Sequence, residues 1–84
     1  AAMKAVHIRT EETVGEYELP FVELFIRLID GVKDVAMVST LHLISVLYDE
    51  TVADITKILD SIRRAGYYAY LYRPMQLALP AAPA

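Results

Sequence analysis

Four glutamates and one histidine near the N-terminus are the residues best suited to bind a ligand. The carboxylates crowd the polar segment 10–18, which a histidine shortly precedes; the five are Glu11, Glu12, Glu16, Glu18 and His7. Carboxylate oxygens suit Zn²⁺, Mg²⁺, Ca²⁺ or Mn²⁺ better than Cu(I). The simpler interpretation is an acidic solvent-exposed loop that complements the N-terminus of the helix after it. A divalent-metal site is the alternative.

Other chemistry finds little support. The 84 residues include no cysteine, which excludes a disulfide, a thiolate nucleophile and a thiolate metal site. Ser39, Ser45 and Ser61 have no plausible catalytic histidine partner in the sequence, and three glycines supply no phosphate-binding loop. A net charge of −3 argues against sequence-independent nucleic-acid binding. We therefore expect no catalysis, no resident cofactor and no nucleic-acid partner.

One domain must position these residues. We expect it at 4–73, after an N-terminal extension left by cloning at 1–3 and before a Pro/Ala-rich linker or tail at 74–84. Alternation predicts a strand at 4–9, and helical spacing of Val22, Phe25, Ile26 and Ile29 predicts a helix at 19–30 that Gly31 ends. Two β-rich segments, 32–40 and 43–48, predict a hairpin.

The C-terminal half predicts one more helix and one more strand. Thr51 is expected to cap a helix that begins at Val52, with Asp54 completing a capping box and Gly66 ending the helix. A strand is expected at 67–72, before Pro74. The order strand, helix, strand, strand, helix, strand predicts an α+β fold, the ferredoxin-like βαββαβ sandwich, with a four-stranded antiparallel sheet and two helices on one face.

The second half of the chain resembles a heavy-metal-associated domain, the module of metallochaperones and of metal-transporting P-type ATPases. The matching positions are Gly31-Val32 with Val35 and Met37, then Val46-x-Tyr48-Asp49, then Ala65-Gly66-Tyr67-x-Ala69. The resemblance implies the ferredoxin-like fold over 4–72. It also implies a Cys-x-x-Cys metal motif whose two positions, counted back from Gly31, fall on Gly15 and Glu18. Because neither is cysteine, we expect a degenerate metal site.

The sheet face that the helices leave uncovered is predicted to be unusually apolar. The chain is 56% hydrophobic, and a domain of this size cannot bury all of that. Strand alternation gives the free face the residues Val38, Leu43, Leu47, Tyr68, Tyr70 and Tyr72. Tyrosine is frequent on half-exposed strands, and it is also enriched in protein interfaces. Leu24 and Leu28 similarly widen the apolar surface of the first helix.

These observations lead to one hypothesis and two alternatives. The hypothesis is a non-catalytic regulatory or protein-interaction module of a cytoplasmic metal-handling protein. Its partner would be another protein, a second copy, or the remainder of a larger, membrane-embedded chain. The first alternative is a divalent-metal module that uses the acidic loop. The second is a small-molecule sensor of the ACT type, which shares the order of strands and helices.

Overall fold

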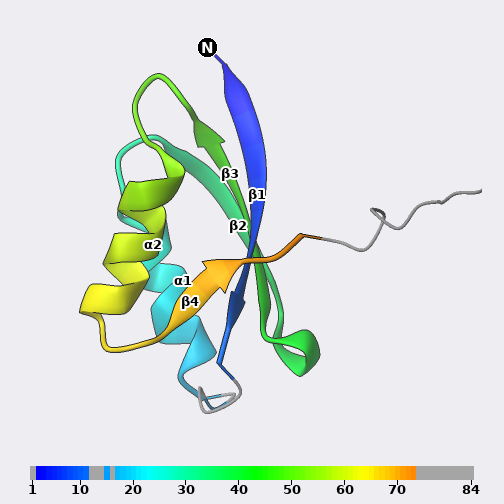
Figure 1. Ribbon diagram of the computed structural model, residues 1–84. Coiled ribbons are helices and arrows are strands. Elements are labelled where there is room, and N and C mark those ends of the chain that lie inside the picture. Colours follow the sequence, from blue (N-terminus) through cyan, green and yellow to red (C-terminus); the bar gives the residue numbers. More distant parts are fainter. Residues whose placement is uncertain (1, 12–14, 16, 74–84) are drawn as a thin grey trace, which may run out of the picture.

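Four strands and two helices form in the predicted order. The computed structural model describes residues 2–11, 15 and 17–73, and Figure 1 shows their arrangement. The strands are β1 (Met3–Thr10), β2 (Val32–Val38), β3 (Leu43–Asp49) and β4 (Ala69–Leu71); the helices are α1 (Leu19–Arg27), α2 (Ile55–Arg64) and a short 3₁₀ turn, η1 (Ser39–Leu41). In the part of the chain described, no helix is long and apolar enough to cross a bilayer.

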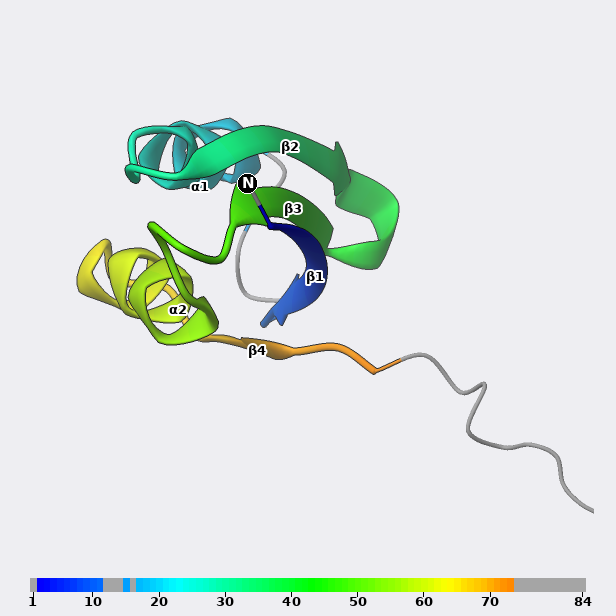
Figure 2. The ribbon, with the colours of Figure 1, turned by 90° about the horizontal axis from the view of Figure 1, so that it is seen from above.

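The sheet has the order β2-β3-β1-β4, and every neighbouring pair is antiparallel. Both helices lie on the same side of it, α1 beside β2 and α2 beside β4 (Figure 2). This arrangement confirms the predicted ferredoxin-like sandwich. The other side of the sheet carries no element of the described chain.

The core forms where the inward residues of the strands meet one side of each helix. Alternate strand positions are buried, as the period of two requires. The fully or nearly fully buried side chains of this layer are Val6, Ile8, Val22, Ile26, Val35, Ile44, Val46, Ile58, Ile62 and Ala69. The sequence therefore assigned the two faces of the sheet correctly.

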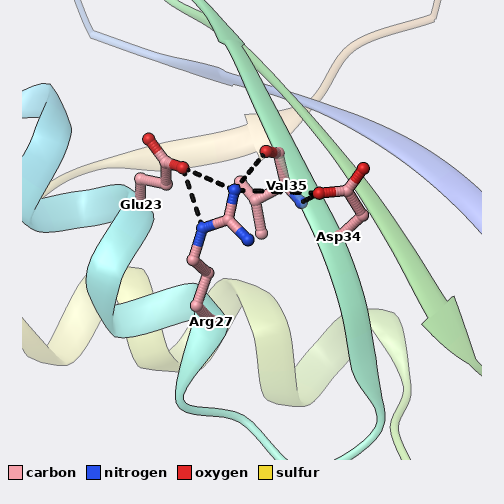
Figure 3. Close-up of polar contacts among 4 residues, drawn as sticks. All are labelled: Glu23, Arg27, Asp34 and Val35. Carbon is pink, nitrogen blue, oxygen red and sulfur yellow. Dashed lines mark hydrogen bonds and ion pairs between the residues drawn. The ribbon is translucent and has the colours of Figure 1, made fainter.

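A charged side chain fastens α1 to the edge strand β2. Arg27 donates from Nε to the Glu23 carboxylate at 2.8 Å and from Nη2 to the Val35 carbonyl oxygen at 2.8 Å (Figure 3). The Asp34 carboxylate lies 3.7 Å from the same guanidinium. Because this network occupies one flank of α1, the only basic side chain of the helix is committed to the domain's own sheet.

The helix α1 ends earlier than predicted. It stops at Arg27, with Leu28 as its C-cap, and does not continue to Asp30. The Ile29 N–H bonds the Ile26 carbonyl, three residues back, so the chain tightens before Gly31 turns it with a φ of +96°. Phe25, expected in the buried stripe, is 40% exposed. The core instead takes Leu19, Val22 and Ile26 from this helix.

The N-cap predicted for α2 is wrong. The helix begins at Ile55, and Asp54 is its N-cap, accepting a hydrogen bond from the Lys57 N–H at 2.8 Å. Thr51 is not free to cap, because its hydroxyl and N–H both donate to the Asp49 carboxylate at 2.6 and 2.9 Å. The Asp49 carboxylate at the end of β3 therefore binds the Thr51 hydroxyl that the predicted capping box needed.

The hairpin and the last strand are shorter than predicted. β2 ends at Val38, because Ser39–Leu41 form the turn η1 and His42 adopts a left-handed backbone with φ +53°. β4 occupies Ala69–Leu71, not 67–72, because the Tyr67 N–H still bonds the Ile62 carbonyl at the end of α2. The predicted linker or tail at 74–84 lies outside the described residues.

Asp49 links the connection between α1 and β2 to the connection between β3 and α2. Its N–H donates to the Gly31 carbonyl at 2.8 Å, and its own carbonyl accepts from Val52 and Ala53. The two hydrogen bonds from Thr51 hold the pKa of the Asp49 carboxyl below its ordinary value of 3.8. One buried acidic residue thereby fixes the turn before β2 against the turn before α2.

The Asp49→Asn variant is expected to lose stability in a pH-dependent manner. A carboxyl whose pKa is lowered on folding stabilises the native state above its unfolded pKa, and that contribution disappears as pH falls through the folded value. The difference in unfolding free energy between the two proteins should therefore be largest near neutral pH and shrink below about pH 4. Urea unfolding across this range measures it; a difference that does not vary with pH would contradict the assignment.

Candidate functional site

The loop before α1 contains the two positions that the resemblance equates with cysteines. Gly15 and Glu18 are joined by a turn, in which the Glu18 N–H donates to the Gly15 carbonyl at 2.9 Å. The Glu18 carboxylate lies near the hydroxyl of Tyr67, which belongs to the α2–β4 connection. Burial raises the pKa of Tyr67 above 10.0, and the charge and hydrogen bond of Glu18 raise it further. The loop before α1 therefore lies beside the connection that follows α2.

Among the described residues, the remaining candidate metal ligands lie apart from one another. His7 lies on the free face of the sheet, with Nδ1 2.7 Å from the Ser45 hydroxyl. Glu11 is exposed just after β1, and its N–H donates to the Tyr68 carbonyl at 3.3 Å. Glu12 and Glu16 lie outside the described residues. Within the described part, no three acidic or histidine side chains are grouped as a metal would need.

The contact between His7 and Ser45 was not anticipated from the sequence, where the two residues are far apart. They are direct cross-strand neighbours in β1 and β3, so the pairing register brings them together. A polar cross-strand pair of this kind stabilises a sheet without any further role. Ser–His catalysis also needs a third group to orient the imidazole, and neither His7 nor Ser45 has another polar side-chain contact in the described structure.

The free sheet face exposes the apolar and aromatic residues that the alternation assigned to it. Val38, Leu47, Tyr68 and Tyr70 are exposed, and Leu43 and Tyr72 are half-buried. Figure 2 shows the reason, since both helices lie across the sheet from this face. We call these six residues together with Arg9 the free sheet face.

Strand register places two rows of residues on this side of the sheet, and Leu47 lies outside both, paired with Ala5 and Asp34. One row crosses all four strands and consists of Val38, Leu43, Arg9 and Tyr70. The other contains Ala36, Ser45 and His7, and the Tyr72 N–H extends it by donating to the His7 carbonyl at 2.9 Å. Residues from opposite ends of the chain therefore form one continuous surface.

The aromatic side chains contact one another and the arginine. The rings of Tyr68 and Tyr70 are tilted, with centroids 5.7 Å apart. The Arg9 guanidinium lies 5.7 Å from the centroid of Tyr72, within the range of a cation–π interaction. A hollow of about 50 Å³ lies among Arg9, Leu41, Leu43 and Tyr72. This surface offers apolar area, hydroxyl groups and one cation, which suits recognition of a macromolecular surface.

Arg9 is the residue of this face that the sequence analysis omitted. Arg9 lies two residues along β1 from His7, so strand alternation places it on the same, free face. The alternation of strand β1 is therefore the signal that identifies Arg9 as part of this face. In the structure Arg9 stands between Leu43 and Tyr70 in the first row.

No protein-family model matches the chain, and the search of curated proteins finds no match either. Solved structures do match its fold. The oxidised MerP from Ralstonia metallidurans CH34 is 18% identical, with a TM-score of 0.81, over 86% of this chain and 100% of that one.

Two structures from Bacillus species also match the fold of the chain. The putative copper-ion-binding protein from Bacillus anthracis is 20% identical, with a TM-score of 0.76, over 82% of this chain and 97% of that one. The N-terminal domain of a potential copper-translocating P-type ATPase from Bacillus subtilis, solved with Cu(I), is 17% identical, with a TM-score of 0.76, over 83% of this chain and 88% of that one. The chain therefore has the fold of heavy-metal-associated domains.

Proposed function

We propose that this chain is a non-catalytic module of a metal-handling protein that acts through protein contact and not through a thiolate-bound metal. The observation that carries the proposal is the row of Val38, Leu43, Arg9 and Tyr70 across the free sheet face. Exposed apolar patches framed by polar groups are typical of interaction sites. Tyrosine and arginine are the residues that most often dominate binding energy in such sites.

The composition of the loop supports the same proposal. Soft thiolate ligands select Cu(I), and neither Gly15 nor Glu18 can supply one. Glu18 instead lies beside Tyr67, where its charge raises the pKa of the Tyr67 hydroxyl. The setting proposed for the module is a cytoplasmic domain of a larger metal-transport protein, by analogy with the P-type ATPase domain of the same fold.

The partner is expected to bind the free sheet face. The test immobilises the chain, incubates it with extract from cells of its source, and identifies retained proteins by mass spectrometry. The proposal requires a metal-transport or metal-regulatory protein among them, with binding weakened at least about tenfold by Tyr70→Arg, since interface anchors typically cost 2 kcal/mol or more. Retention of that protein by Tyr70→Arg at full strength would contradict the proposal.

Metal titration separates this function from the acidic-loop alternative. Zn²⁺, Mn²⁺ and Cu(I) are added in turn to isotopically labelled protein while the amide signals of residues 10–18 are followed. The proposal expects no saturable shift, because the loop has no thiolate to select Cu(I). Among the described residues, no three acidic or histidine side chains are grouped to hold Zn²⁺ or Mn²⁺. A saturable shift in this segment would replace the proposal with the divalent-metal function.

A further inference from the structure

The outward side of α1 exposes four large apolar residues in a continuous patch. They are Phe21 at 59%, Leu24 at 53%, Phe25 at 40% and Leu28 at 71% of full exposure. Their spacing of three, four and seven residues brings them onto one side of the helix, opposite Leu19, Val22 and Ile26 in the core. This helix is therefore apolar on both its buried and its exposed sides. We call the four residues the α1 patch.

A groove extends the α1 patch toward α2. Its apolar floor is Phe25 and Ile29, and its far wall is the charged side of α2, with Lys57, Asp60 and Arg64. The groove measures about 650 Å³. Within the described residues, no ion pair joins any of these three charged side chains to a neighbour.

We propose that the α1 patch and this groove form the interface of a symmetric homodimer. The charges around the patch favour a second copy over a partner of one charge sign, because the charged residues without an ion pair in the described structure are balanced: Asp30 and Asp60 against Lys57 and Arg64. Under a two-fold axis the same surface meets itself, so a balanced rim can pair each sign with its opposite. Arg27 and Glu23 already pair within α1, which leaves Asp30 to meet the unpaired cations of α2.

The area of the patch is consistent with an association of moderate strength. Taking roughly 200 Å² for each complete side chain, the exposed fractions correspond to about 450 Å² of apolar surface per copy. Two copies would bury about 900 Å² from the patch, and the groove walls would bring the total toward the ~1,200 Å² at which standard interfaces begin. The spacing of the four residues is the one by which helices pack against each other.

This inference goes beyond the proposed function, because it concerns the opposite side of the molecule. The helices and the free sheet face lie on opposite sides of the sheet (Figure 2). A dimer formed through α1 would leave both free sheet faces accessible. Such a dimer could bind two partner surfaces at once, which strengthens attachment to a partner that is itself paired or clustered.

Sedimentation velocity on the wild-type chain and two matched variants tests the proposal. Leu24→Glu changes the patch, and Leu41→Glu changes a leucine of the same 53% exposure in the η1 turn. We expect the wild type and Leu41→Glu to dimerise at about 100 µM, and Leu24→Glu to associate at least about tenfold more weakly. Leu28→Glu, at the most exposed position of the patch, serves as a second variant should Leu24→Glu fold poorly.

Several outcomes would overturn this interface. They are a wild type that stays monomeric over the whole concentration range, a dimer that persists in the folded patch variants, and a dimer that Leu41→Glu disrupts equally. Dimerisation without partner binding would leave this inference intact while removing the proposed function. Partner binding by a wild-type chain that stays monomeric would leave the proposed function intact while removing this inference. The failure of one proposal can therefore be told from the failure of the other.

Discussion

The Gly31→Ala variant is expected to lose about 2–5 kcal/mol of folding free energy. Gly31 has a φ of +96°, a backbone conformation that costs an L-residue about 1–2 kcal/mol. A β-carbon there would also lie 2.9 Å from Val52 Cβ and 3.0 Å from Ala53 Cβ, closer than such atoms approach. Neither atom is the far end of a flexible side chain, so the backbone itself must move. Overpacking of this kind adds about 1–3 kcal/mol.

Gly66 provides a matched control for this prediction. Its φ of +101° is nearly the same, but a β-carbon there meets no atom within 4 Å. Gly66→Ala should therefore show the conformational cost alone, about 1–2 kcal/mol. Urea unfolding of both variants measures the two losses, and their difference isolates the contact with the turn before α2. Equal losses would mean that the close approach at Gly31 has no energetic weight.

A domain of 84 residues is expected to have a stability of only about 4–13 kcal/mol, so the larger loss at Gly31 approaches the lower end of that range. Melting temperature follows the same order, since 1 kcal/mol shifts it by roughly 4–8 °C in a domain of this size. Gly66→Ala should remain clearly folded at 25 °C.

The sequence predicted the fold well because the fold depends on periodicity. Val6 and Ile8, for instance, alternate with Ala5 and His7, and the structure buries the first pair and exposes the second. A one-residue change of register would reverse both assignments, so a strand with one buried face has little freedom. The order of strands and helices then leaves few topologies to consider. The exposed aromatic residues of the free sheet face follow from the same alternation.

The boundaries were predicted less well because they depend on competition between nearby polar groups. Thr51 and Asp54 are both good N-cap residues, and the sequence does not reveal that the Asp49 carboxylate takes the Thr51 hydroxyl. The tertiary structure also joins the Asp49 N–H to the Gly31 carbonyl. The choice of cap is thus decided by the contact between Thr51 and Asp49, two residues apart, which competes with capping.

The first helix illustrates a second limit. Phe25 and Ile26 are adjacent and equally apolar, yet the structure buries Ile26 completely and leaves Phe25 40% exposed. Apolar residues cover both sides of α1, so periodicity alone could not decide which side faces the sheet. The Arg27 side chain settles the rotation, because its bonds to Glu23 and Val35 hold one flank of the helix against β2 (Figure 3).

The second large effect is expected from the double variant Gly15→Cys/Glu18→Cys, which should create a Cu(I) site. Gly15 can accept a side chain, because its backbone is not left-handed and a β-carbon would meet only Glu18 Oε2, at 3.6 Å. The turn between residues 15 and 18 brings the two positions together. Two thiolates on one turn supply the soft ligands that select Cu(I). The variant should bind one Cu(I), at least about a thousandfold more tightly than the wild type.

Competition with a chromogenic Cu(I) chelator measures this gain, and Gly15→Ser/Glu18→Ser is the matched control. The serine pair loses the same Glu18–Tyr67 contact and adds side chains of similar size, but it supplies hydroxyls in place of thiolates. Tight binding by the cysteine pair alone would mean that the scaffold still has the geometry for a soft metal and that thiolates are its missing component. A folded cysteine variant that leaves Cu(I) with the chelator would mean that the loop backbone has changed as well. In that case the protein could not regain the chemistry by two substitutions.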